Sequence, residues 1–171
     1  MRCLYRLGQF LRHVTAREAA LDLTPARRAL SGEALALFRR MPPGDQHHAL
    51  EVLARLRARG PVADDLVAAA LLHDVGKALA GRAPLWRAAV ILLGRSGRGA
   101  LQRLASPHPT SWRYPLYVLL HHATLGAALC ERAGCSPAVV RLVRLHDAEP
   151  GTEARELAGS LAALRAADDV S

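Results

Sequence analysis

The sequence predicts an all-α fold, a compact helical bundle in a single domain. Apolar residues recur with helical periodicity through almost the whole chain, and no useful length alternates as a half-buried strand does. Ala and Leu, which are strong helix formers, are among the dominant residues. A chain of 171 residues suits one ordinary domain with a real core. No internal repeat or linker divides it.

The first predicted helices precede residue 43. The segment Leu4 to Val14 is amphipathic and basic. Thr24-Pro25 pairs a cap residue with a first-turn proline and opens a second helix. A third helix spans about 33–40 and ends at Pro42-Pro43-Gly44. We expect two parts, a helical extension at 1–41 that packs on the core and the main domain at 42–171.

Breaker residues separate the helices predicted for the main domain. Gly60-Pro61 follows the first of them, and Ser136-Pro137 again combines a cap with a first-turn proline. Residues 94–109 are rich in Gly, Ser and Pro, so we expect loop there, with one short helix around Leu101. The helix before Gly134 is expected to be continuous or to break near His121. These helices are expected at about 45–59, 63–79, 84–93, 112–133, 136–146 and 153–169.

The net charge of +8 points to an anionic partner, namely a phosphate ester, a nucleic acid or a membrane surface. A genome that favours Arg codons would produce the same charge without such a partner. Only 4% of the residues are aromatic. Basic residues without interleaved aromatics do not indicate a nucleic-acid surface, so nucleic acid is disfavoured as a partner.

The cysteines and the N-terminus favour a cytoplasmic protein. An odd number of cysteines in a chain of this length does not predict a disulfide framework, so we interpret all three as reduced thiols. Arginines interrupt the apolar positions near the N-terminus and exclude a signal peptide. The apolar run at 90–93 is far too short to span a membrane.

The most informative feature is the pair His73-Asp74, which ends an almost wholly apolar run from Leu66 to Leu72. An imidazole and a carboxylate at the end of a buried helix would cost several kcal/mol if left unpaired, roughly 2–7 for each polar group. A bound metal ion removes this cost, because both groups are good ligands for divalent cations. A buried metal site is therefore the leading hypothesis.

Helical phase directs four more His or Asp side chains inward. Each lies four residues from an apolar residue on the inward face of its own helix. They are His48, His122, His146 and Asp168. His47 and His121 fall on other faces and are weaker candidates. Any one inward His is more often a hydrogen-bonded core residue, but six polar groups from five helices favour one or two transition metals.

This pattern resembles the HD superfamily of metal-dependent phosphohydrolases, from about residue 45 to the end of the chain. His73-Asp74 with Gly76-Lys77 looks like the HD-x-G-K form. His122 with Gly126 resembles the H-x-x-x-G segment of members that hold two metals. The resemblance implies an HD-type helical bundle. Asp147 stands where related members often have a second His, and no G-Y-P segment follows, which disfavours a cyclic-dinucleotide phosphodiesterase of the HD-GYP type.

The resemblance also implies a dinuclear site. One metal would be held by His48, His73, Asp74 and Asp168, and Asp74 would bridge to a second metal on His122 and His146. The expected cofactor is one or two divalent ions, of Mn, Fe, Co, Ni or Zn, with Mg as a further option. Two metals activate water and neutralise phosphoryl oxygens, so Asp74 is the principal catalytic residue.

The function implied is a phosphohydrolase acting on a phosphomonoester or phosphodiester, with a phosphorylated small molecule or nucleotide as substrate. Lys77 either contacts a phosphate oxygen or only favours the helix dipole. Five arginines near the Gly-rich stretch are candidates for a phosphate clamp; they are Arg82, Arg87, Arg95, Arg98 and Arg113. The alternatives are a dinuclear iron oxygenase of the HD type and a non-catalytic sensor or binding module.

Overall fold

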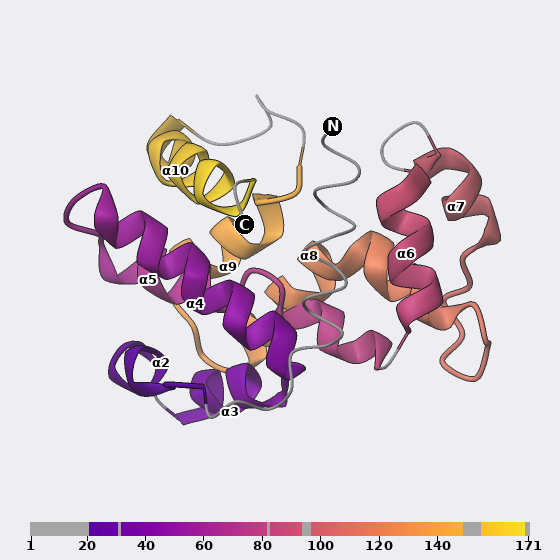
Figure 1. Cartoon of the computed structure of the whole chain (residues 1–171), viewed down its shortest axis with the longest axis horizontal. Helices are drawn as coiled ribbons and strands as arrows, with labels where there is room; N and C mark the ends of the chain where they lie inside the picture. Colours follow the sequence, from indigo (N-terminus) through magenta and orange to yellow (C-terminus); the bar gives the residue numbers. More distant parts are fainter. Residues whose placement is uncertain (1–20, 31, 82, 94–96, 149–154, 170–171) are drawn as a thin grey trace.

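All regular secondary structure in the described part of the chain is helical, which confirms the predicted all-α class. The structure is a computed structural model that describes residues 21–30, 32–81, 83–93, 97–148 and 155–169 (Figure 1). None of the helices in these ranges is both long enough and apolar enough to cross a membrane.

The helices follow the predicted order. They are α2 (Thr24–Ala29), α3 (Gly32–Arg40), α4 (Pro43–Ala58), α5 (Asp64–Leu72), η1 (Val75–Ala80), α6 (Pro84–Leu93), α7 (Arg98–Leu104), α8 (Tyr114–Arg132), α9 (Pro137–Leu145), η2 (Arg155–Leu157) and α10 (Ala158–Asp168). The helix predicted at Leu4 to Val14 lies outside the described residues. Ser136 caps α9 as expected, since its hydroxyl accepts a hydrogen bond from the Val139 amide at 3.2 Å.

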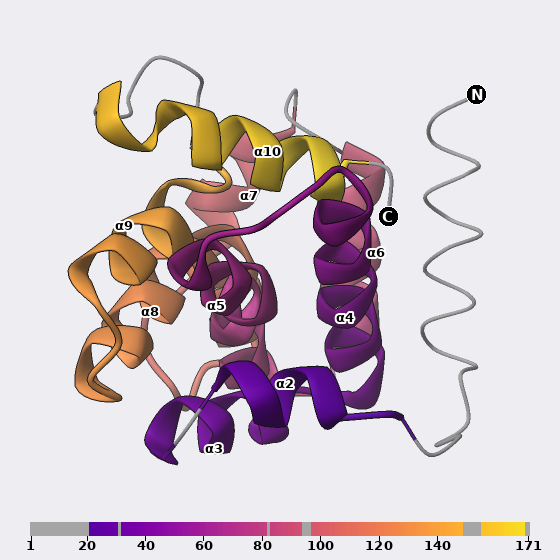
Figure 2. The same ribbon diagram turned by 90° about the vertical axis from the view of Figure 1, so that its left-hand side faces the viewer.

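Helices α2 and α3 pack on the same apolar core as the rest of the chain. Ala26 of α2 and Phe38 of α3 are completely buried in the main hydrophobic cluster. Figure 2 shows both helices along one edge of the bundle, beneath α4 and α5. The division of the chain at residue 42 stays a prediction.

Helix α5 is the centre of the bundle. Most of its residues after the first turn are buried, on every face of the helix. It packs against α4 and α9, and also against α2, α3 and α10 (Figures 1 and 2). The acidic residues Asp64 and Asp65 begin the helix, where negative charge is favoured by the helix dipole. The C-terminal end of α5 therefore brings His73 and Asp74 into the interior.

The prediction of one continuous helix over 63–79 is wrong at its middle. Helix α5 ends at Leu72, and the 3₁₀-helix η1 begins at Val75. Between them Asp74 has φ −99° and ψ 5°, outside the helical region. Consecutive residues of a continuous α-helix point in different directions. The turn instead lets His73 and Asp74 face the same region.

Helix α8 is kinked at His121, which has φ −118° and ψ 15°. The second of the two alternatives for this segment, a break near His121, is therefore the one observed. The kink lies directly before His122, which is buried. It lets the second half of α8 run against η1, the most closely packed neighbour of α8.

Two glycines permit the contact between η1 and α8. A Cβ atom on Gly76 would lie 2.0 Å from the backbone oxygen of His122 and 2.8 Å from the backbone nitrogen of Gly126. A Cβ atom on Gly126 would lie 3.1 Å from the nitrogen of Gly76. Because the obstructing atoms belong to backbone, a side chain at Gly76 would force the two helices apart. The close packing of η1 on α8 therefore explains the glycine in both motifs, Gly76 after His73-Asp74 and Gly126 after His122.

Replacing Gly76 by Ala should lower the free energy of unfolding by about 2 kcal/mol or more, since η1 must move away from α8. Gly159→Ala is the matched control. Gly159 is exposed in α10 and a Cβ there would meet nothing within 4 Å, so this change should raise stability by about 0.5–1 kcal/mol. Urea denaturation followed by circular dichroism measures both. A Gly76→Ala protein as stable as the wild type would contradict the close contact.

Candidate metal centre

Six His and Asp side chains from separate elements meet in the interior. They come from α4, the turn after α5, α8, the end of α9 and the end of α10; they are His48, His73, Asp74, His122, His146 and Asp168. These are the six residues predicted as metal ligands. The structure brings all of them together around Asp74. His47 instead lies on the surface next to Glu51, at 3.9 Å.

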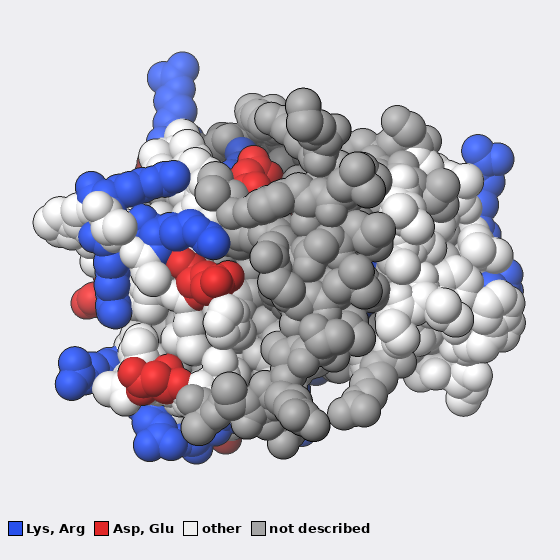
Figure 3. Space-filling model, in the orientation of Figure 1, with Lys and Arg blue, Asp and Glu red and all other residues white. Residues whose placement is uncertain are grey.

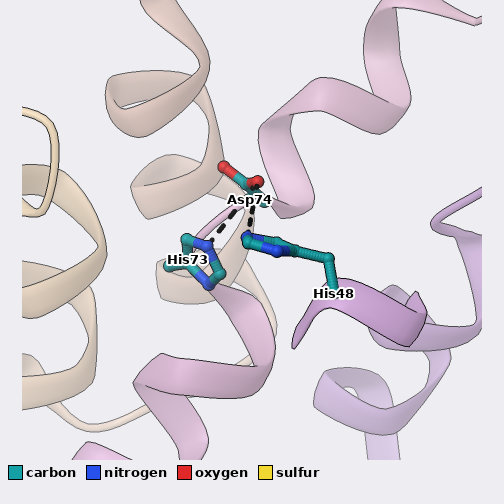
Figure 4. A group of neighbouring side chains, drawn as sticks. All are labelled: His48, His73 and Asp74. Atoms are coloured by element: carbon teal, nitrogen blue, oxygen red, sulfur yellow. Dashed lines mark ion pairs between the residues drawn. The ribbon is translucent and has the colours of Figure 1, made fainter. Parts of the chain in front are cut away.

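The first group of candidate ligands surrounds Oδ2 of Asp74. The Nε2 atoms of His48 and His73 lie 3.8 Å and 3.6 Å from this oxygen. Figure 4 shows both imidazoles directed at Asp74 from two different elements. Asp168 completes the group, because its Oδ1 lies 2.9 Å from Nε2 of His48 and 3.6 Å from Nε2 of His73. Two imidazoles and two carboxylates therefore converge.

The second group surrounds the other oxygen of Asp74. The Nε2 atoms of His122 and His146 lie 3.4 Å and 3.7 Å from Oδ1 of Asp74, and 3.3 Å from each other. Asp74 thus presents one oxygen to each group. The ligand atoms of each triad, one with His48 and His73 and one with His122 and His146, lie within 4.8 Å of one another. Each triad can hold a metal ion, and a carboxylate placed in this way can bridge two ions.

The backbone orients three of the four imidazoles in the same manner. The Nδ1 atoms of His73, His122 and His146 lie 2.9, 2.8 and 2.7 Å from the carbonyl oxygen three residues earlier. A carbonyl oxygen only accepts hydrogen bonds, so Nδ1 carries the proton in the neutral imidazole. The lone pair then lies on Nε2, which faces Asp74. This second hydrogen bond is typical of metal-ligating histidines.

His73 shows that the interior here suits a cation. The residue is completely buried, and its Nε2 is the one buried side-chain nitrogen or oxygen among the described residues that has no hydrogen-bond partner. The nearest oxygens of Asp74 and Asp168, both at 3.6 Å, are beyond hydrogen-bonding distance. An unsatisfied buried polar group costs about 1–3 kcal/mol. A divalent ion bound at Nε2 would remove that cost.

The two groups differ in charge. Burial opposes the protonated form of His73, but the carboxylates of Asp74 and Asp168 outweigh it and raise its pKa to about 9. Burial lowers the pKa of His122 to about 4, and the charge of Lys77 acts in the same direction. Burial would raise the pKa of Asp74, yet the charges of Lys77 and His73 hold it well below its usual value. At neutral pH His73 in the first group is therefore protonated, whereas His122 in the second group is neutral.

The centre opens into a pocket of about 260 Å³. The residues that line it are Asp74, Lys77, His122, His146, Asp147, Ala148, Arg165, Asp168 and Asp169. Lys77, for which phosphate contact was one of two alternatives, lies on this wall with its Nζ 2.6 Å from Oδ2 of Asp74. A larger hollow of about 380 Å³ lies between α2 and the connection from α4 to α5, and none of the six candidate ligands lines it.

Two of the arginines proposed for a phosphate clamp, Arg87 and Arg98, have other contacts. Arg87 donates two hydrogen bonds of 2.8 Å to the buried carboxylate of Asp45. Arg98 pairs with Asp147. On the face that Figure 3 shows, Lys and Arg side chains gather mainly on the side of α2, α4, α5 and α10, and fewer lie on the side of α6 and α7. Of the remaining clamp candidates, Arg113 precedes α8, and Arg82 and Arg95 lie outside the described residues.

Arg165 is a pocket residue that the sequence pattern did not reveal. Its Nε donates to the carbonyl oxygen of His146 at 3.2 Å, and a terminal nitrogen donates to that of Leu145 at 2.9 Å. It therefore ties α10, which carries Asp168, to the end of α9, which carries His146. An Arg in the last turn of a helix is a recognisable feature. Its attachment to a neighbouring helix is not readable from the sequence.

Comparison with known proteins leaves the family of the chain open. It matches no protein-family model, no curated protein and no solved structure. The residues and distances of the centre itself are therefore the basis for its function.

Removing single ligands should change the number of metal ions bound per chain. Asp168→Ala should empty the first group and His146→Ala the second, whereas Asp74→Ala should empty both, because each group uses one of its oxygens. His47→Ala, on the surface, should bind as the wild type does. Elemental analysis after loading with Mn and dialysis measures the occupancy. A wild-type protein that never exceeds one ion per chain would contradict the second group.

Metal binding to the first group should release a proton at neutral pH. With a pKa of about 9, His73 is protonated in the metal-free protein at pH 7 and must lose that proton to bind a metal at Nε2. The apparent affinity should therefore rise about tenfold per unit as pH increases towards 9, and then level off. His122, with a pKa of about 4, is already neutral and should add no proton release.

Calorimetric titration with Mn in buffers of different ionisation enthalpy measures this proton release. His122→Ala isolates the first group and should keep the release of about one proton. An affinity of the first group that does not change between pH 6 and pH 8 would contradict the charge assigned to His73.

Proposed function

We propose that the protein is a metal-dependent phosphohydrolase of the HD type that acts on phosphoesters. The observation that carries this proposal is the sharing of Asp74 between two ligand groups, next to a pocket lined by Lys77 and Arg165. Paired metal sites of this kind suit phosphoryl transfer, and the cationic side chains suit an anionic substrate. The motif around His73-Asp74 and the segment from His122 to Gly126 support the same function.

The donor set favours divalent transition metals. Four imidazoles and two carboxylates suit Mn, Fe, Co, Ni or Zn better than Mg, which prefers oxygen ligands. Bound ions would lower the pKa of water and neutralise charge on phosphoryl oxygens. His48, His73, Asp74 and Asp168 would hold one ion. Asp74, His122 and His146 would hold the other.

Lys77 supplies a fixed positive charge at the pocket. Burial opposes its charged form, but Asp74 at 2.6 Å outweighs this effect and raises the Lys77 pKa, so the ammonium keeps its protons at neutral pH. It offers donors for a phosphate oxygen at the same time as it compensates Asp74. Loss of Lys77 should therefore weaken substrate binding more than it slows the chemical step.

Two alternative functions would use a similar centre. A dinuclear iron oxygenase would use the same two ligand groups, and the cations on the pocket wall favour an anionic substrate for either reaction. A non-catalytic binding module has no need for two ligand groups that share a carboxylate. The proposal of hydrolysis accounts for both features. Turnover in the absence of oxygen separates hydrolysis from the oxygenase alternative.

Asp74→Ala should reduce hydrolysis at least about a thousandfold, because both ligand groups lose an oxygen and metal activation supplies several kcal/mol. Lys77→Ala should raise KM with a smaller effect on kcat, and His47→Ala should stay within about twofold of the wild type. The measurement is anaerobic hydrolysis of p-nitrophenyl phosphate and bis(p-nitrophenyl) phosphate with Mn, Fe, Co, Ni, Zn or Mg.

The surface residue His47 makes this a matched comparison, because it is the immediate neighbour of His48 and has the same chemistry. Circular dichroism verifies that each variant is folded. An Asp74→Ala protein with full activity would refute the mechanism. An inactive His47→Ala protein would show that the other histidine of the pair serves the site.

A further inference from the structure

The pocket is small, and its wall is polar. Its volume of about 260 Å³ is below the roughly 300–1,000 Å³ of pockets for drug-sized ligands. Among the described residues that line it there is no Phe, Tyr or Trp and no apolar side chain larger than that of Ala148. Residues 149–154 and 170–171, which adjoin lining residues in the chain, also contain no aromatic residue. A nucleobase would find no stacking partner among these side chains.

The described aromatic side chains gather elsewhere. Trp86 of α6 stacks on Trp112 at 5.2 Å between ring centroids, and Tyr114 stacks on Tyr117 at the start of α8. Stacking of a base on an aromatic side chain contributes about 1–3 kcal/mol. Without such stacking, the base of a nucleotide would add little to the affinity for the pocket. The base would also need more space than the pocket volume provides.

Asp147 provides a hydrogen-bond acceptor on the pocket wall. Its Oδ2 accepts hydrogen bonds from both terminal nitrogens of Arg98, at 3.3 Å and 3.4 Å. Arg98 also donates to the backbone oxygen of Leu120 at 3.2 Å, so the arginine is anchored. Within the described residues no donor pairs with Oδ1 of Asp147. Because Arg98 balances its charge, Asp147 offers an acceptor for a neutral hydroxyl rather than a site for a cation.

We propose that the substrate is a phosphomonoester of a small polyhydroxylated compound and that Asp147 accepts a hydrogen bond from one of its hydroxyl groups. This inference rests on the proposed phosphohydrolase function of the same site. The phosphate would lie next to Lys77 and the candidate ligands, and the hydroxylated part would lie against Asp147. Asp147 is thus a specificity residue, and Arg98 is the residue that positions it.

Ribose 5-phosphate and adenosine 5′-monophosphate provide the test, because they share the phosphate and the sugar and differ in the base. Their phosphonate isosteres, in which a methylene replaces the ester oxygen, cannot be hydrolysed. Calorimetric titration of the Mn-loaded protein with each isostere gives an equilibrium affinity that is independent of catalysis. We expect the ribose compound to bind at least as tightly as the adenosine compound. An adenosine isostere that binds tenfold more tightly would overturn the inference.

A pair of variants tests Asp147 itself. Asp147→Asn should weaken binding of the ribose isostere at least about fivefold relative to methylphosphonate, which has no hydroxyl group on carbon, because the acceptor of the hydrogen bond loses its charge. Asp64→Asn, which removes a carboxylate at the far end of α5, should leave both affinities within twofold. Equal weakening of both ligands by Asp147→Asn would overturn the role of Asp147.

Hydrolysis of ribose 5-phosphate and adenosine 5′-monophosphate themselves separates this inference from the proposed function. If neither compound is hydrolysed while the ribose isostere binds at least as tightly as the adenosine isostere, the phosphohydrolase proposal fails and the assignment of the pocket stands. If adenosine 5′-monophosphate is hydrolysed with a kcat/KM tenfold above that of ribose 5-phosphate, the function stands and the inference about the substrate fails.

Discussion

The carboxylate of Asp74 is the constraint on which the centre depends. It is almost completely buried, and a buried charge is tolerated only where compensating groups surround it. Lys77 lies 2.6 Å from one of its oxygens, and four imidazoles lie within 4 Å of the two oxygens. Each compensating side chain comes from a defined place in the fold. The elements that carry these side chains must therefore meet at the buried carboxylate of Asp74.

The packing of apolar surfaces, rather than an ion, brings these elements together. After its first turn, helix α5 is buried on every face, and it ends directly before His73, while the inward stripes of α4, α9 and α10 pack around it. Gly76 and Gly126 let η1 approach α8 at backbone distance, which sets Asp74 next to His122. Arg165 then joins the ends of α9 and α10. The ligand groups are preformed by the same contacts that stabilise the bundle.

Charge distinguishes the two halves of the centre. Asp168 adds a second carboxylate near His48 and His73, whereas the second group has two imidazoles and shares only Asp74. The first half therefore holds a proton on His73 at neutral pH and must release it when a metal ion binds. In the adjoining pocket, Lys77 and Arg165 lie on the wall, and Arg98 balances the charge of Asp147. This arrangement is the basis for the proposed small phosphorylated substrate with hydroxyl groups.

Helical phase in the sequence was enough to predict the all-α class, to prefer His48 over His47 and to select four of the six candidate ligands. Those properties follow from local periodicity, since an inward face is defined within each helix. His73 and Asp74 were selected because they end an apolar run. Local periodicity could not predict the turn at His73 and Asp74, nor decide that α8 is kinked at His121. It also could not predict the partners of Arg87, Arg98 and Arg165. Each depends on backbone and side chains from distant parts of the chain that packing brings close together. The pattern of residues along the sequence does not contain these distances.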